Sequence, residues 1–244
     1  MAEYQKIQTL FKRDGKNIII PSQFTLPEFE YLKDCKWECT EKIDGTNMRV
    51  ELTPIIDENG TLTDVKMEFK GRTDKADIPK HLLEKMKVLF NKEDLIDFYY
   101  SDTNKEPAPV TLYGEGYGMN IQKGGNYIKD GVDFILFDVR IGHWWLNRQT
   151  CEDIATAFGL KIVPFMGMMT ILEACELVKK GLKSTIAENK DYDAEGLVLK
   201  TPNGLLLRNG ERLITKIKTV DFRKYASTYG DQPVEQKVNP KYKE

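Results

Sequence analysis

The sequence has few of the residues that mark disulfide-rich, metal-bound or membrane-spanning proteins. Only four cysteines and two histidines occur among its 244 residues. Four cysteines are too few for a disulfide scaffold at this length, and Cys35 and Cys39 have no second pair behind them to complete a zinc site. No apolar run approaches the ~18–20 residues that a membrane span needs. We therefore expect a globular protein with reduced, structural thiols.

A strong excess of positive charge is also missing. The chain has 36 Lys and Arg against 38 Asp and Glu, a formal net charge of −2. This balance argues against a protein that binds nucleic acid by simple electrostatics, which would normally be strongly basic. The charge is unevenly placed, because residues 196–244 carry 10 Lys and Arg against 5 Asp and Glu, whereas residues 1–195 carry 26 against 33. The cations therefore gather in the C-terminal fifth.

Linkers, internal repeats and an apolar leader are absent as well. We therefore expect a single domain over residues 1–244, with a polar tail at 232–244, located in the cytoplasm. The mixture of elements predicts an α+β fold with antiparallel sheets and peripheral helices. Strands are expected at 37–52 (one long strand or a pair around Gly45), 61–69, 110–113, 134–141, 196–200, 205–208 and 213–218, and helices at 79–90, 150–158 and from Thr170 to Gly181.

A lysine just before an Asp-Gly turn is the first candidate for chemistry. It is Lys42 in the segment Glu41-Lys42-Ile43-Asp44-Gly45-Thr46-Asn47. A lysine attacks only when neutral, and about one free lysine side chain in a thousand is neutral near neutral pH. Burial, neighbouring cations or a bound metal would lower its pKa. By itself the pattern is weak, because a surface lysine beside a turn looks the same.

Further motifs follow this lysine in a fixed order. They are Lys70-Gly71-Arg72-Thr73, Tyr113-Gly114-Glu115-Gly116, Phe134-Ile135-Leu136-Phe137-Asp138, Ala194-Glu195-Gly196-Leu197-Val198-Leu199-Lys200 and Ile214-Thr215-Lys216-Ile217-Lys218. Together with the Lys42 segment, this series resembles the covalent nucleotidyltransferase superfamily of ATP-dependent ligases and mRNA capping enzymes. It extends over nearly three quarters of the chain.

Within that superfamily the chain is most similar to RNA ligases of the RNA ligase 2 type, which include phage and kinetoplastid editing enzymes. Those ligases have Thr or Ser followed by Asn after the glycine, as in Thr46-Asn47 here, whereas DNA ligases and capping enzymes usually have Arg where this chain has Asn47. Asp44 departs from the His that RNA ligases of this type often have. It is shared with the wider superfamily.

The resemblance implies a role for each motif residue. Lys42 would attack the α-phosphate of ATP and form a lysyl-AMP, while Lys216 and Lys218 would neutralise the phosphates and depress the pKa of Lys42. Arg72 would contact a ribose or phosphate, Glu115 a ribose hydroxyl, and Phe137 the adenine. Nucleotide binding is assigned to Glu41, Asn47, Arg72, Glu115, Phe137 and Glu195, and Glu195 would also hold Mg²⁺ or Mn²⁺.

Simpler interpretations of these residues stay open. Arg72 fits a surface arginine at a strand end, and Phe137, in an apolar strand, fits ordinary core. The alternation of Lys216 and Lys218 also fits a solvated strand face. The glycines beside Glu115 would let a nucleotide approach the backbone closely. The loop Gln122-Lys123-Gly124-Gly125-Asn126-Tyr127 fits a contact with nucleic acid or an ordinary hairpin loop.

The resemblance implies an α+β adenylyltransferase (ATP-grasp-like ligase) domain, with antiparallel sheets flanking an ATP cleft. The expected activity is ATP-dependent sealing of RNA 5′-phosphate and 3′-hydroxyl ends through lysyl-AMP and AMP-capped RNA. An ATP-dependent DNA ligase and a non-catalytic nucleotide- or RNA-binding module on the same fold are the alternatives. Only 26 residues follow Lys218, so neither an OB-fold nor a helical C-terminal domain is expected, and a partner protein could replace it. The resemblance favours a phage source, and a phage-encoded protein would be located in the host cytoplasm.

Overall fold

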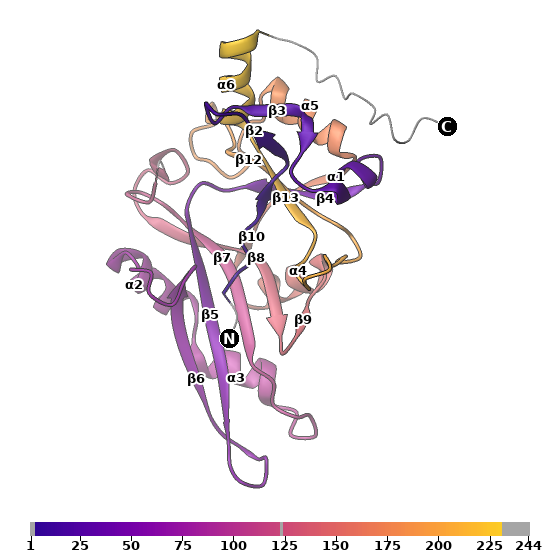
Figure 1. Cartoon of the computed structure of the whole chain (residues 1–244). Helices are drawn as coiled ribbons and strands as arrows, with labels where there is room; N and C mark the ends of the chain where they lie inside the picture. The colour runs from indigo at the N-terminus through magenta and orange to yellow at the C-terminus, as the bar shows by residue number, and fades with distance from the viewer. Residues whose placement is uncertain (1–2, 123, 231–244) are drawn as a thin grey trace. The chain divides into compact units, whose positions relative to one another are not determined.

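A computed structural model describes residues 3–122 and 124–230 of the chain (Figure 1). Contacts divide the described chain into two compact units. The first unit contains residues 3–5, 43–163 and 186–189, and the second contains residues 6–42, 164–185 and 190–230. The chain crosses between the units several times without a linker, once directly after Lys42. The single domain over residues 1–244 stays a prediction, and the predicted tail at 232–244 lies outside the described residues.

The first unit is built on a six-stranded sheet. Its strand order is β10-β8-β7-β5-β6, with β9 paired to β8, and every pair is antiparallel except β10 with β8. The strands are β5 (Thr46–Ile56), β6 (Leu62–Gly71), β7 (Val110–Gly118), β8 (Val132–Ile141), β9 (Trp144–Trp145) and β10 (Lys161–Ile162). The helices are α2 (Lys80–Leu89), α3 (Lys92–Tyr100) and α4 (Arg148–Ala157), with a short 3-10 turn η1 at Gly124–Asn126.

One face of this sheet forms the core of the first unit. Alternation along β5 places Met48, Val50 and Leu52 on that face, where all three are buried. Apolar side chains from α2, α3 and α4 pack against them, among them Met86 and Leu95. The opposite face therefore receives the alternate positions of β5, which are polar. This face carries the site residues of the first unit.

The second unit is built on a five-stranded sheet. Its order is β1-β13-β12-β4-β11, antiparallel except where β1 pairs with β13, and a separate pair is formed by β2 and β3. The strands are β1 (Gln8–Thr9), β2 (Phe11–Arg13), β3 (Ile19–Phe24), β4 (Trp37–Lys42), β11 (Phe165–Met169), β12 (Gly196–Lys200) and β13 (Ile214–Lys218). The helices are α1 (Pro27–Tyr31), α5 (Ile171–Lys180) and α6 (Thr219–Tyr229).

Helix α5 shows how local sequence shapes the second unit. The Thr170 hydroxyl accepts from the Glu173 backbone N–H, and the Glu173 carboxylate accepts from the Thr170 backbone N–H, which completes the predicted capping box. The helix ends at Gly181, whose φ of 97° favours glycine. Its apolar face packs on Trp37 and Leu197 of the sheet. This packing leaves the other face of β4, β12 and β13 to the lysines.

The predicted fold class is confirmed, with differences in detail. The expected strand at 205–208 is wrong, because only an isolated bridge between Leu206 and Arg212 forms there. Strand β7 runs to Gly118 rather than Tyr113, and α3 and α6 were not predicted. None of the four cysteines forms a disulfide, and burial raises the pKa of the Cys39 thiol to about 12. Among the described residues no helix is both long and apolar enough to cross a membrane.

Candidate functional site

Three strands of the second unit bring two lysines onto one carboxylate. The Lys42 Nζ donates to Glu195 Oε2 at 2.5 Å, and the Lys218 Nζ contacts Glu195 Oε1 at 2.6 Å. Their side chains are 19% (Lys42), 15% (Glu195) and 30% (Lys218) exposed, so the group is largely shielded and still reachable from solvent. Burial opposes ionisation of Glu195, but the two ammonium groups outweigh it and hold the pKa of this carboxyl below its ordinary value.

Gly196 is the point where these strands meet. It is the register partner of both Lys42 on β4 and Lys218 on β13. Its φ is 151°, and a Cβ at this position would lie 1.9 Å from the Ile217 carbonyl oxygen. Only glycine fits so close to the neighbouring strand. Because Gly196 pairs with Lys42 and with Lys218, the preceding residue, Glu195, lies next to both lysines.

Lys216 completes the cluster. It lies two residues before Lys218 on β13, and so on the same face of the sheet. Burial lowers its pKa, and the nearby charges of Lys42 and Lys218 lower it further. The three lysines predicted to be catalytic therefore lie together around Glu195.

Glu41, the neighbour of Lys42, turns to the other side of the strand. Its side chain is 1% exposed, and its carboxylate accepts from the Ser184 hydroxyl at 2.5 Å, the Thr185 N–H at 2.9 Å and the Thr185 hydroxyl at 2.7 Å. These bonds tie the segment after α5 to β4. The nucleotide contact predicted for Glu41 stays a prediction, and the observed contacts give this residue an anchoring part.

Two more predicted residues face each other on the first unit's sheet. Asn47 on β5 is the register partner of Glu115 on β7. The Asn47 Oδ1 is buried without a hydrogen-bond partner among the described residues. Buried polar atoms normally have partners, so an unpaired one needs an explanation, such as a ligand. The polar face of β5 and β7 thus offers an acceptor of this kind beside a carboxylate.

The glycines around Glu115 are required by the packing of the core. A Cβ on Gly114 would lie 2.1 Å from the Phe134 ring, and one on Gly116 would lie 2.4 Å from a Leu82 methyl. Both glycines face the core, whereas Glu115 points to the opposite face. They make room for core side chains, and the close approach of a nucleotide stays a prediction. The role predicted for Glu115 itself is unaffected.

Phe137 lies at an irregularity of β8. The β7–β8 register pairs Tyr113 with Asp138 and Gly114 with Leu136, which leaves Phe137 as the extra residue of a β-bulge. Bulges re-aim side chains and are common beside functional sites. Phe137 is half-buried and meets Tyr4 edge-on, with ring centroids 5.0 Å apart. The Tyr4 hydroxyl donates to Asp138 at 2.5 Å and fixes that contact. Phe137 is therefore not plain core.

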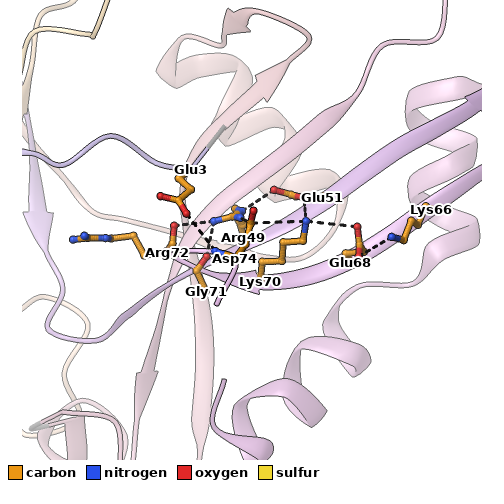
Figure 2. Close-up of polar contacts among 9 residues, drawn as sticks. All are labelled: Glu3, Arg49, Glu51, Lys66, Glu68, Lys70, Gly71, Arg72 and Asp74. Atoms are coloured by element: carbon orange, nitrogen blue, oxygen red, sulfur yellow. Dashed lines mark hydrogen bonds and ion pairs between the residues drawn. The ribbon is translucent and has the colours of Figure 1, made fainter. Parts of the chain in front are cut away.

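Arg72 stands at the end of β6 with an exposed side chain. Its guanidinium has no hydrogen bond or ion pair within residues 3–122 and 124–230, whereas its carbonyl accepts from Arg49 at 2.8 Å. Figure 2 shows the Arg72 side chain directed away from the polar network that surrounds Arg49. Sequence inspection missed Arg49 altogether, although its odd-numbered position beside Asn47 on β5 places both on the polar face.

The loop after β7 is structural at its aromatic end. Tyr127 is fully buried, meets Tyr117 edge-on, and its hydroxyl accepts from the Asp44 N–H at 3.2 Å. It therefore supports the Asp44-Gly45 turn and is not available to stack on a base. Gly45 is also needed there, because a Cβ would lie 2.3 Å from the Gly116 carbonyl. Lys123 of this loop lies outside the described residues.

The acidic ligands for a metal are few. The described residues contain no group of three or more His, Cys, Asp or Glu side chains that could hold an ion. Glu195 is the one predicted ligand, and both of its oxygens accept from lysines. Magnesium commonly binds through one or two carboxylates together with substrate phosphates and water. The residues fit an ion that arrives with a phosphorylated substrate, and do not form a closed protein cage.

Comparison with known proteins identifies the fold and the family. Solved structures of the Naegleria gruberi RNA ligase resemble this chain: one with PPi at a TM-score of 0.55 and 21% identity over 93% of this chain and 59% of that one. A mutant of that ligase with ATP and Mn matches at a TM-score of 0.57 and 19% sequence identity, over 95% of this chain and 59% of the ligase chain. A second mutant with ATP and Mn matches at a TM-score of 0.56 and 20% sequence identity, over 90% of this chain and 57% of the ligase chain. This chain spans less than two thirds of the length of those ligase chains.

The fold is therefore that of RNA ligase nucleotidyltransferase domains. Residues 36–218, about three quarters of the chain, match the RNA ligase family. The chain belongs to this family. No curated protein matches it in sequence.

Proposed function

We propose that this chain is an ATP-dependent RNA ligase that seals RNA 5′-phosphate and 3′-hydroxyl ends. The observation that carries the proposal is the cluster of Lys42, Lys216 and Lys218 around Glu195. Two ammonium groups pair with one carboxylate and a third lies nearby, and this concentration of positive charge is complementary to a triphosphate. Solved structures of the Naegleria gruberi ligase with ATP and Mn, with PPi, and with AMP and Mn support ATP and a divalent metal as its ligands.

In the first step, the neutral Lys42 Nζ attacks the α-phosphorus of ATP. A P–N bond forms, the bond from the α-phosphorus to its bridging oxygen breaks, and pyrophosphate leaves with the electron pair. Glu195 holds Nζ in place through its 2.5 Å contact. Because its pKa is lowered, Glu195 is a poor base, and the proton from Nζ passes to solvent. Lys216 and Lys218 stabilise the charge that builds on the phosphates.

In the later steps, an RNA 5′-phosphate oxygen attacks the phosphorus of lysyl-AMP, the P–N bond breaks, and Lys42 is released. A 3′-hydroxyl then attacks the RNA 5′-phosphorus, a phosphodiester forms, and AMP leaves. Glu195 would be the protein ligand of a bound Mg²⁺ or Mn²⁺, which would supply Lewis-acid polarisation of the phosphates. Arg72, Glu115, Phe137 and Asn47 keep the phosphate, ribose and base contacts that the resemblance assigns to them. Repair of broken RNA in the cytoplasm is the setting that we propose for this activity.

Intact-protein mass spectrometry after incubation with ATP and Mg²⁺ tests the first step. We expect a covalent AMP adduct on the wild-type chain and none on Lys42→Ala. Lys87→Ala is the matched control, because Lys87 is an exposed lysine on α2 that contacts only Glu84 among the residues described. An adduct on Lys42→Ala would contradict the mechanism. No adduct on the wild-type chain would favour a nucleotide- or RNA-binding module.

Nicked duplexes with RNA or DNA on each side of the nick test the substrate. We expect sealing when RNA strands flank the nick, and equal sealing of DNA nicks would identify a DNA ligase instead. A 5′-adenylylated RNA strand isolates the last step, because it needs no ATP. A partner protein that supplies further RNA-binding surface belongs to the same proposal. If the chain alone is adenylylated and does not seal RNA, a partner protein of this kind is needed.

A further inference from the structure

A buried arginine lies at the middle of the first unit's polar sheet face. Arg49 on β5 pairs in register with Lys70 on β6 and Tyr113 on β7, and its side chain is 0% exposed. A charged group without solvent costs several kcal/mol unless its donors are satisfied. The contacts of the Arg49 guanidinium therefore indicate the role of this residue.

The guanidinium uses its donors on four acceptors. Nε donates to Glu51 Oε1 at 2.7 Å, and Nη1 donates to the carbonyls of Gly71 at 2.7 Å and Arg72 at 2.8 Å. Nη2 donates to the Asp74 carboxylate. Figure 2 shows these contacts converging on Arg49 from β5 and from the end of β6. The planar fork of five donors suits this set, and an ammonium group has no equivalent geometry.

The charges within this network balance. Glu51 is 2% exposed and accepts from Lys70 at 2.7 Å through its second oxygen. Arg49 and Lys70 contact the carboxylates of Glu51 and Asp74. A third carboxylate at Lys70, that of Glu68, has Lys66 as a further cation partner. Unlike the Lys42 cluster, this group is complete without a ligand. The network holds the backbone at the end of β6 in one position.

The backbone it fixes is that of Arg72. The bonds from Arg49 reach the residue before Arg72, Arg72 itself and Asp74 two residues later. The turn that follows is closed by the Ala76 N–H, which donates to the Thr73 carbonyl at 3.1 Å, and a Cβ on Gly71 would lie 2.7 Å from the Ala76 Cβ. The exposed Arg72 side chain therefore extends from a tightly held turn.

We propose that Arg49 is a positioning residue, which clamps the Gly71–Asp74 turn so that Arg72 points at the nucleotide. This inference rests on the proposed function, because it takes Arg72 as a nucleotide contact. A guanidinium on a mobile turn would lose conformational entropy each time a nucleotide binds. On a turn that is already ordered, this loss does not oppose binding.

Asp74→Asn is the main test variant, because Asp74 is 62% exposed and the change leaves the buried core intact. Its matched control is Glu68→Gln. Glu68 also contacts Lys70, at 3.6 Å against 3.9 Å for Asp74, and pairs with Lys66, but it does not touch the turn. Arg49→Lys is the stronger variant, since it keeps the charge and loses the fork.

The measurement is the rate of AMP-adduct formation against ATP concentration, with and without Arg72→Ala. We expect the ATP concentration for half-maximal rate to rise about threefold in Asp74→Asn and about tenfold in Arg49→Lys, with no change in Glu68→Gln. In the Arg72→Ala background both increases should disappear, because the clamp acts through Arg72. Hydrogen exchange of the 72–76 amides should quicken in Asp74→Asn and Arg49→Lys only.

The outcomes separate this inference from the function on which it rests. Additive effects in the Arg72→Ala background, or equal effects of Asp74→Asn and Glu68→Gln, would show a general structural role and overturn the clamp. Adduct formation unaffected by Arg72→Ala would overturn both the contact and the clamp. If the wild-type chain forms no adduct, the proposed function fails, and unchanged hydrogen exchange in Asp74→Asn and Arg49→Lys would then overturn the clamp separately.

Discussion

The two units of this protein each hold a cluster of charged side chains, and the clusters differ in balance. In the second unit, Lys42 and Lys218 share Glu195 as a carboxylate partner, Lys216 lies close enough for their charges to lower its pKa, and the group is partly open to solvent. In the first unit, each cation of the Arg49 network contacts carboxylates, and Arg49 and Glu51 are almost completely buried.

This difference separates a binding site from a structural support. Buried charges are tolerated when each has its partner, and removing one partner then leaves the other uncompensated. Excess charge of one sign costs stability, and it is kept where an oppositely charged ligand completes the group. The comparison predicts that the Arg49 network stabilises the fold, and that the lysine cluster costs stability until a phosphorylated substrate binds.

Arg49→Met should have the largest effect on stability. It leaves Glu51 buried without one of its cations, and we expect the free energy of unfolding to fall by about 3–5 kcal/mol in urea titrations. Lys66→Met is the control, because Lys66 is 59% exposed and its pair with Glu68 should contribute less than about 1 kcal/mol. Similar losses in the two variants would remove the contrast between a buried network and a surface pair.

Gly196→Ala tests the strand crossing that builds the lysine cluster. The added Cβ would meet the Ile217 carbonyl at 1.9 Å, so we expect a loss of about 3 kcal/mol and weaker adduct formation. Gly204→Ala provides the comparison, since Gly204 has a φ of 60° with nothing within 4 Å and should cost about 1 kcal/mol. Equal losses would mean that positive φ alone, and not the close approach, requires glycine at 196.

The pH dependence of Glu195→Gln tests the pairing at the centre of the cluster. The pKa of Glu195 is lowered in the folded chain, so its carboxylate contributes stability above the unfolded-state pKa near 4.5 and loses it as the pH falls through the folded value. Thermal unfolding should show wild type as more stable than Glu195→Gln at pH 6, with the difference closing below pH ~4.5. A difference that does not change with pH would show that Glu195 acts by packing.

Lys216→Met should have the smallest effect, and one of opposite sign. Because the pKa of Lys216 is lowered, its protonated form costs stability at every pH below the folded value. We expect a gain of up to about 1 kcal/mol at pH 7, together with slower adduct formation. A loss of stability would place Lys216 with Arg49 among the structural residues and break the comparison.

Short-range patterns were enough to predict much of this protein. The capping box at Thr170 and Glu173, the alternation of Lys216 and Lys218, and the Asp-Gly turn after Lys42 each depend on residues a few positions apart. Local patterns failed at 205–208, where the apolar run Leu205 to Leu207 forms only an isolated bridge, between Leu206 and Arg212. They also did not show that the glycines beside Glu115 make room for core side chains, because neighbours such as Phe134 come from another strand.

The sequence by itself determined the order of the motifs, the α+β class and the identity of the residues proposed for chemistry. The tertiary structure alone decided which of them meet. Glu195 reaches Lys42 across 153 positions of chain, and Arg49 reaches the turn at Arg72 across 23. Such contacts depend on strand register, and register is set by the whole hydrophobic pattern of each sheet together with close approaches such as that at Gly196. No local segment contains that information.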